Sequence, residues 1–322
     1  MPQDPPDRVH ADAAGRRHLL RRTLAWPWLP LASLSWLTAC ASSPWPEVPA
    51  GPGSSSARSR LQESADAHGR AAWRGLTDIN VSFSGEWRSL VKQLQPVLVD
   101  AGFRASSQER LLPGAGLLAQ DHRGQAGHKQ VLRRQGNPGG LAGAASGEVT
   151  VWRNGSLDTD RDVRDAAALV ADGYHLFLAG PMALAGFAGP VNWGPPETLD
   201  NRRCDQLLLD RTPGLGFSAS DRLALFIDRD LGLLRRLRFS LDGLRSTVGA
   251  VAEVDFFEHL SQHGVWWPRR FAERLRLPIP DLPVHDWRLT GLDVNRGYGA
   301  DAISGAVFSG AAAAPARALP AG

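Results

Sequence analysis

The chain has little of several residue types and lacks the motifs that mark several well-known classes of enzyme. Its 322 residues include two cysteines, Cys40 and Cys204, so it has no Cys-x-x-Cys pair and no dense disulfide framework. It also lacks a Gly-x-Ser-x-Gly elbow, a Walker A loop and a His-Glu-x-x-His pair. These absences remove the sequence support for a serine hydrolase, a P-loop nucleotide-binding enzyme or a zinc peptidase.

The charge of the chain gives no support for a nucleic-acid partner. The net charge is +3, and residues 1–39 hold five arginines against three aspartates, so the remainder is close to neutral. Binding to nucleic acid needs a basic surface that displaces counterions from the phosphates. We therefore expect no nucleic-acid partner.

Residues 1–39 are predicted to be an export signal that is removed. A cationic segment, residues 16–22, precedes an uncharged, mostly apolar run, and small residues lead up to Cys40. The alternative is a transmembrane or core helix. A spanning helix needs about 20 apolar residues, whereas this run is shorter and is interrupted by Pro27 and Pro30.

Residues 37–40 (Leu-Thr-Ala-Cys) resemble the bacterial lipobox. The resemblance implies that Cys40 becomes the N-terminal residue, is acylated and attaches the protein to membrane lipid. Ala41, in place of an aspartate, implies the outer membrane, with the protein facing the periplasm. Residues 16–21 also resemble a twin-arginine signal, so the Sec and twin-arginine export routes both stay open. If Cys40 is acylated, Cys204 has no partner for an intramolecular disulfide.

Composition divides the rest of the chain into three parts. Residues 40–60 contain the lipid-attachment cysteine and are rich in Pro, Ser, Gly and Ala, which is typical of a flexible tether. Residues 61–309 are predicted to form a single β-rich domain. Residues 310–322 are mostly Ala, Pro and Gly and are predicted to be a disordered tail.

Alternating apolar residues predict an antiparallel meander in the second half of the chain. The alternation covers residues 223–227, 237–241 and 248–256, and a fourth strand is expected after Gly264. Residues 242–243 (Asp-Gly) are typical of a hairpin turn. We expect one apolar face and one arginine-rich face, whose charges either pair with neighbouring acids or meet anionic lipid head groups.

The first half of the chain is predicted to be mixed. A strand is expected over residues 79–83, a hairpin at Asn154-Gly155 and a helix over residues 160–178. Residues 89–99 are a shorter helical candidate, which Pro96 breaks or ends.

A family resemblance centres on residues 242–271. The Asp-Gly pair, a Val/Phe-rich strand and the run Gly-Val-Trp-Trp-Pro-Arg-Arg-Phe at 264–271 resemble a hairpin edge of lipoprotein-sorting sequences, over residues 220–277. The family is that of the outer-membrane lipoprotein carrier and its receptor. It implies a mainly β or α+β fold, in which helices plug the concave side of a curved, open antiparallel sheet, an incomplete barrel. It also implies that an acyl chain of a lipid or lipoprotein binds in that concavity.

Five residues are candidates for the ligand-binding surface. Phe239, Val254 and Phe271 are predicted to point into the apolar face of the sheet. Trp193 lies in a Gly- and Pro-rich loop and is a candidate for the lip of a pocket. Trp266 is one of two adjacent tryptophans, of which one ring is expected to enter the concave side and the other to face solvent.

Histidines are the candidates for other chemistry. Three pairs are spaced for joint action: His259 and His263 on one helix face, His122 and His128 across a hairpin, and His285 with Asp286 as a base and its orienting carboxylate. Surface or hydrogen-bonded histidines are the simpler interpretation. Because no third ligand follows in a recognisable motif, we expect no metal and no cofactor.

The sequence thus favours an anchored envelope lipoprotein, without enzymatic activity, that binds a hydrophobic or amphipathic ligand. Two alternatives stay open. One is an anchored envelope hydrolase that uses a His/Asp or His/Glu pair, and the other is a structural subunit of an envelope complex.

Overall fold

The computed structural model describes residues 45–46, 51–134, 147–276, 280–308 and 310–316. All of them belong to one compact unit, residues 43–322. The predicted signal and Cys40 lie outside the described residues. Within the described ranges, no helix is both long and apolar enough to cross a membrane.

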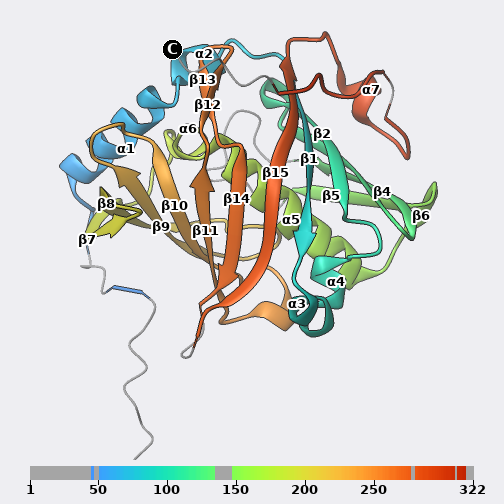
Figure 1. Cartoon of the computed structure of the whole chain (residues 1–322), viewed down its shortest axis with the longest axis horizontal. Coiled ribbons are helices and arrows are strands. Elements are labelled where there is room, and N and C mark those ends of the chain that lie inside the picture. The colour runs from blue at the N-terminus through green and yellow to red at the C-terminus, as the bar shows by residue number, and fades with distance from the viewer. Residues whose placement is uncertain (1–44, 47–50, 135–146, 277–279, 309, 317–322) are drawn as a thin grey trace, which may run out of the picture. The chain divides into compact units, whose positions relative to one another are not determined.

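Most of the described residues fold around one large antiparallel sheet (Figure 1). The strands are β1 (Ile79–Trp87), β2 (Ser106–Leu112), β3 (Leu117–Gly124), β4 (Gly127–Arg134), β5 (Glu148–Arg153), β6 (Ser156–Asp158), β7 (Asn192–Leu199), β8 (Arg202–Arg211), β9 (Asp221–Asp228), β10 (Leu234–Ser240), β11 (Val251–Phe257), β12 (Leu260–Gln262), β13 (Val265–Trp267), β14 (Arg270–Leu275) and β15 (Leu282–Val294). Thirteen of them form the sheet in the order β6-β5-β4-β3-β2-β1-β15-β14-β11-β10-β9-β8-β7, and β12 pairs with β13 alone. β6 and β7 stay as separate edges, so the sheet is open.

The pairing of β1 with β15 joins the two halves of the chain into this sheet. It runs from Ile79 opposite Val294 to Trp87 opposite His285. The chain therefore forms a meander from β1 to β6 on one side and returns from β7 to β15 on the other. The predicted fold class, a mainly β or α+β protein with a curved open sheet, is confirmed.

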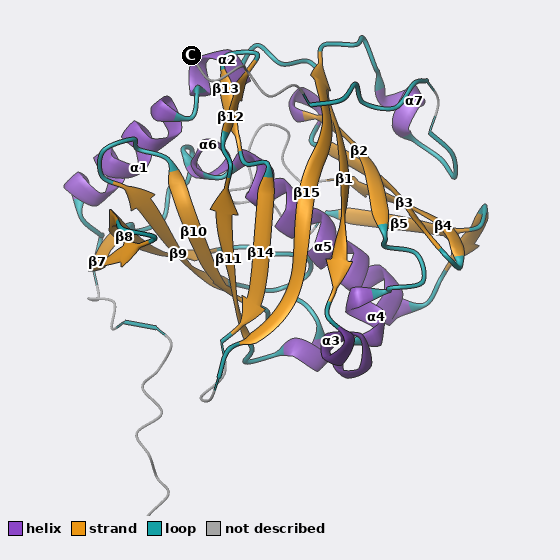
Figure 2. Ribbon diagram, in the orientation of Figure 1, coloured by secondary structure: helices purple, strands orange, loops and turns teal. Residues whose placement is uncertain are grey.

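Helices occupy the concave side and one end of the sheet, except for α7, which packs through Ile303 on the other face of β2 and β3 (Figure 2). The described helices are α1 (Ser55–Ala67), α2 (Arg70–Trp73), α3 (Ser89–Leu94), α4 (Pro96–Val99), α5 (Arg161–Ala179), α6 (Pro181–Leu184) and α7 (Ala300–Ile303). The long helix α5 crosses the inner side of the sheet, and α3 and α4 lie beside its N-terminal half. Pro96 separates α3 from α4, as the sequence predicts.

Local sequence explains why α5 forms where it does. The side chain of Asp160 accepts a hydrogen bond from the backbone N–H of Val163 at 3.1 Å and so caps the N-terminus. Gly180, with a positive φ of 47°, ends the helix. The predicted helix over residues 160–178 is confirmed, and so is the hairpin at Asn154-Gly155, where both residues have positive φ.

The main hydrophobic core lies between α5 and the inner face of the sheet. It includes Leu176 and Phe177 of α5 together with Phe239, Val254 and Phe271 of three strands. The rings of Phe177 and Phe239 have centroids 5.7 Å apart. The prediction that Phe239, Val254 and Phe271 share one apolar face is therefore confirmed.

The opposite face of this half of the sheet carries a network of ion pairs. Glu253 is fully buried and accepts a hydrogen bond of 2.8 Å from Nε of Arg238. It also pairs with Arg274, which reaches Asp255 as well. The arginine-rich face is thus matched by the interleaved acids of β11, as cross-strand pairing predicts.

The connection from β10 to β11 is wider than the Asp-Gly signal predicts. β10 ends at Ser240 and β11 begins at Val251, so residues 241–250 form a loop in place of a tight hairpin. Leu241 and Leu244 are buried, and the hydroxyl of Thr247 donates to the backbone oxygen of Leu244 at 3.0 Å. Burial of these leucines stabilises a longer loop, which the turn residues alone do not reveal.

Ordered structure also reaches into the predicted tether and tail. α1 begins at Ser55, within the segment 40–60, and Ser54 caps it by accepting from the N–H of Ala57 at 3.3 Å. Near the other end, Pro315 forms a bridge with Gly291 of β15. The described part of residues 310–322 is therefore packed on the sheet as far as residue 316.

Candidate functional site

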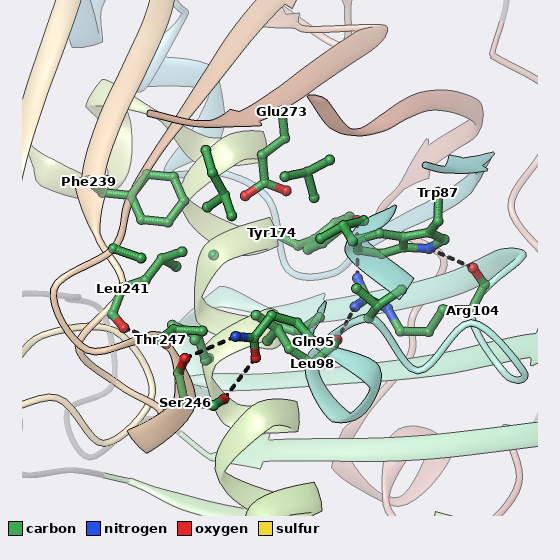
Figure 3. A pocket seen from close by; sticks show the side chains of 18 of the residues that line it. Trp87, Gln95, Leu98, Arg104, Tyr174, Phe239, Leu241, Ser246, Thr247 and Glu273 are labelled. Atoms are coloured by element: carbon green, nitrogen blue, oxygen red, sulfur yellow. Dashed lines mark hydrogen bonds between the residues drawn. The ribbon is translucent and has the colours of Figure 1, made fainter. Parts of the chain in front are cut away.

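A pocket remains between α5 and the inner face of the sheet (Figure 3). Its cavity volume is about 130 Å³, and part of it is open to solvent. Its walls come from α5, from β10 and β14, from α3 and α4, and from the loop 241–250. The exposed lining residues Ser246 and Val248 lie in that loop, which places the opening between the loop and the short helices.

Hydrogen bonds connect the two sides of this opening. The hydroxyl of Ser246 donates to Oε1 of Gln95 at 2.8 Å, and Nε2 of Gln95 donates to the backbone oxygen of Ser246 at 2.9 Å. Gln95 is the residue between α3 and α4. The rim is therefore held by two contacts that involve exposed groups and that water can replace.

The walls of the pocket are mainly apolar. They include Leu169 and Phe177 of α5, Phe239 of β10, and Leu98 of α4. Gly173 also faces the pocket from the middle of α5, and a Cβ atom built there would meet only the ring of Phe177, at 3.7 Å. A glycine inside a helix is unfavourable by about 0.5–1 kcal/mol relative to alanine. Here it leaves space where a side chain would otherwise fill the pocket.

One end of the pocket is polar and is organised by Arg104. This arginine is 1% exposed and stacks over the ring of Trp87, with 4.6 Å between its guanidinium carbon and the ring centroid. It donates from Nη1 to the backbone oxygen of Leu98 at 2.9 Å and from Nη2 to the hydroxyl of Tyr174 at 3.2 Å. Figure 3 shows both bonds, with Arg104 reaching between Leu98 and Trp87.

The contacts of Tyr174 define where the protons lie. Because a guanidinium only donates, the oxygen of Tyr174 accepts from Arg104 and its own hydrogen points to Nε2 of His285, 2.6 Å away. His285 therefore carries its ring proton on Nδ1, which lies 3.1 Å from Oε2 of Glu273. Arg104, Tyr174 and His285 form one buried hydrogen-bonded chain beside an apolar pocket, and Glu273 lies next to its end without completing a hydrogen bond to Nδ1.

Burial shifts the pKa values of Glu273, His285 and Tyr174 towards their neutral forms. It raises the pKa of the Glu273 carboxyl to about 7, lowers that of His285 to about 3, and raises that of the Tyr174 phenol. A His/Glu pair therefore exists, but its imidazole is a weak base at neutral pH and the adjacent phenol is a weak acid. The arrangement suits hydrogen bonding to a ligand better than proton transfer.

The structure separates the five candidate ligand residues. Phe239 lines the pocket, while Val254 and Phe271 lie in the hydrophobic core and are absent from the lining. Trp193 is 39% exposed on the edge strand β7 and donates from Nε1 to the hydroxyl of Ser56 at 2.9 Å. Trp266 is also 39% exposed, because it is the neighbouring Trp267 that enters the core. Neither exposed tryptophan lines this pocket.

The histidine pairs are also placed differently from their expected geometry. His259 and His263 flank the short strand β12, so they share no helix face, and His122 lies opposite Lys129 instead of His128. Nε of Arg270 donates to Oδ1 of Asp286 at 3.0 Å. The neighbouring His285 instead contacts Tyr174, on the other face of the strand. In the part of the chain that the structure describes, no three His, Cys, Asp or Glu side chains gather as a metal site.

The polar residues of the pocket are not predicted from the sequence, although the sequence positions of two of them are unusual. Glu273 lies midway between Phe271 and Leu275, so it is an acid at an inward position of an apolar strand face. Tyr174 is one of only two tyrosines in the chain and falls on the apolar side of the predicted helix. Arg104 lies in a loop before β2 and leaves no comparable pattern.

Comparison with known proteins finds similarity only among solved structures. No protein-family model and no curated protein matches the chain. Similar structures include a domain described as an outer membrane lipoprotein-sorting protein domain from Vibrio parahaemolyticus (10% identity, 77% of this chain and 97% of the other, TM-score 0.40). A LolA superfamily protein from Nitrosomonas europaea is also similar, with 11% identity over 77% of this chain and 97% of the other and a TM-score of 0.43. A DUF1329 family protein from Desulfovibrio piger has 11% identity over 79% of this chain and 98% of the other and a TM-score of 0.46.

All three TM-scores are below 0.5, and we therefore take the function from the pocket of this chain.

Proposed function

We propose that this chain is an anchored envelope lipoprotein that binds a hydrophobic or amphipathic ligand, such as an acyl chain of a lipid or lipoprotein. The observation that carries the proposal is the apolar pocket between α5 and the sheet, lined by Leu169, Phe177 and Phe239. Pockets for small ligands are mainly apolar, with a few fixed polar groups. The Arg104–Tyr174 end supplies those polar groups.

Gly173 supports this proposal because its position opens the pocket at a cost in helix stability. We expect Gly173→Leu to place a side chain in the ligand space and to weaken binding of the fluorescent probe 1-aminoanthracene at least tenfold. Gly173→Ala is the matched control, since a single methyl group meets only the Phe177 ring and should leave binding within about threefold. A folded Gly173→Leu protein that binds the probe as tightly as the parent would place the ligand elsewhere.

The lipobox resemblance supports the second part of the proposal, attachment through an acylated Cys40 in the outer membrane, facing the periplasm. Acyl chains contribute about 0.8 kcal/mol per buried CH₂, and two chains suffice for stable anchoring. We expect cells making the parent chain to incorporate labelled palmitate into it, and cells making Cys40→Ser to fail to do so. Cys204→Ser is the control, because Cys204 is a buried free thiol. Continued labelling of Cys40→Ser would refute acylation at this position.

A further inference from the structure

Arg104 is a buried cation without a partner anion. No carboxylate of a described residue forms a salt bridge with it, and its two hydrogen bonds go to neutral oxygens, those of Leu98 and Tyr174. Its Nε is buried and has no hydrogen-bond partner. An unpaired buried charge is costly, so such a group is expected to meet an anion.

The nearby acids of the chain do not supply that anion. Oε2 of Glu273 lies 3.1 Å from Nδ1 of His285, and Oε1 of Glu109 accepts from the hydroxyl of Ser107 at 3.1 Å. Burial raises the pKa of both carboxyls to about 7, although the charge of Arg104 lowers each of them. Neither carboxylate forms a salt bridge with Arg104, so its guanidinium has no direct anionic contact among the described residues at this end of the apolar pocket.

We propose that Arg104 binds the carboxylate of a long-chain fatty acid whose hydrocarbon chain enters the apolar pocket. This rests on the proposed function and names the class of ligand. A guanidinium is held here at a fixed orientation by Leu98, Tyr174 and the Trp87 ring, which suits a planar carboxylate. One cation matches one negative charge, whereas a phosphate monoester would bring a second charge close to Glu273.

The test compares ligands that share a chain and differ in head group. Oleate, methyl oleate and oleoyl lysophosphatidate would compete with 1-aminoanthracene for the full chain carrying Cys40→Ser, which removes competition from its own acyl groups. We expect oleate to bind at least tenfold more tightly than methyl oleate, and more tightly than the lysophosphatidate. This comparison needs no change in the pocket, so it is decisive even if an Arg104 variant fails to fold.

Arg104→Gln should reduce the preference for oleate over methyl oleate to less than about threefold. Arg88 is an exposed arginine before α3, so the control variant Arg88→Gln should leave this preference unchanged. Equal binding of oleate and methyl oleate by the parent chain would overturn the carboxylate site while leaving the proposed function intact. Tighter binding of the lysophosphatidate than of oleate would overturn the carboxylate site and indicate a phosphate-binding site at Arg104. If none of the three displaced the probe, both proposals would fail.

Discussion

Replacing Arg133 with methionine is expected to lower the free energy of unfolding by about 3–5 kcal/mol. Arg133 of β4 donates from Nε to Oδ1 of Asp172 at 3.0 Å and from Nη2 to Oδ2 at 2.8 Å. The two side chains are 4% and 3% exposed, and Asp172 lies on α5. The substitution leaves a buried carboxylate without its bidentate partner and loosens the helix that fills the concave side. Thermal unfolding should shift down by roughly 10 °C.

Two further variants separate the ion pair from general packing. Arg133→Met combined with Asp172→Leu removes both charges, so we expect it to recover much of the loss. Arg161→Met on the same helix breaks a pair with Asp165 in which the arginine is 88% exposed, and should cost no more than about 0.5 kcal/mol. If Arg133→Met cost no more than Arg161→Met, the buried pair would not be the link between α5 and the sheet.

Acid is expected to unfold the protein at a mild pH because several of its histidines are buried in the neutral form. Burial lowers the pKa of His68 to about 4 and that of His285 to about 3, and it lowers that of His122 well below the usual 6.5. Half-buried His175 and His259 shift in the same direction. Between pH 6.5 and about 4 the unfolded chain binds protons that the folded chain does not, so stability falls as the pH falls.

The raised pKa values of Glu109 and Glu273 act in the opposite direction. Between their usual value of 4.5 and about 7, the folded chain keeps protons that the unfolded chain releases, so stability falls as the pH rises. The histidines outnumber these carboxyls, and we expect maximal stability near about pH 6–7 and a loss on the order of several kcal/mol at pH 4. Chemical denaturation at a series of pH values measures this profile.

His68→Gln tests the contribution of one histidine. The backbone N–H of Leu234 lies 3.3 Å from Nε2 of His68, and Nδ1 lies 2.8 Å from the backbone oxygen of Ser64. Glutamine can keep one of these bonds but does not titrate, so the variant should be less stable at pH 7 and lose less stability towards pH 4. His263→Asn, at an exposed turn, is the control. An unchanged pH dependence in His68→Gln would show that protonation of this imidazole does not drive acid unfolding.

The strands that the sequence predicts well are those whose inward residues are apolar. Leu223, Leu225 and Ile227 of β9 alternate because one face of that strand packs in the core. The strands β2, β3 and β4 are missed for the opposite reason. Their inward positions include Glu109 opposite Gln120, and His122 opposite Lys129, all of them buried. Polar residues on both faces remove the alternation on which a prediction depends.

The polar end of the pocket is harder to predict, because it forms from segments that are far apart in the sequence. Arg104 and Tyr174 are 70 positions apart, and Tyr174 and His285 are 111 positions apart. Their contact depends on the β1–β15 pairing and on the placement of α5, neither of which a local pattern specifies. Alternation predicts Phe239, which lines the pocket, but no local pattern predicts that Arg104 and Tyr174 meet at its polar end.

Mass spectrometry of the molecules that copurify with the protein tests the central claim most directly. The full chain with Cys40→Ser would be purified without detergent and compared with its Gly173→Leu variant. Binding in the pocket predicts that acyl lipids, with fatty acids among them, accompany the first protein in near-stoichiometric amount and are depleted from the second. The absence of any acyl compound from the first, or equal amounts in both, would contradict a ligand site between α5 and the sheet.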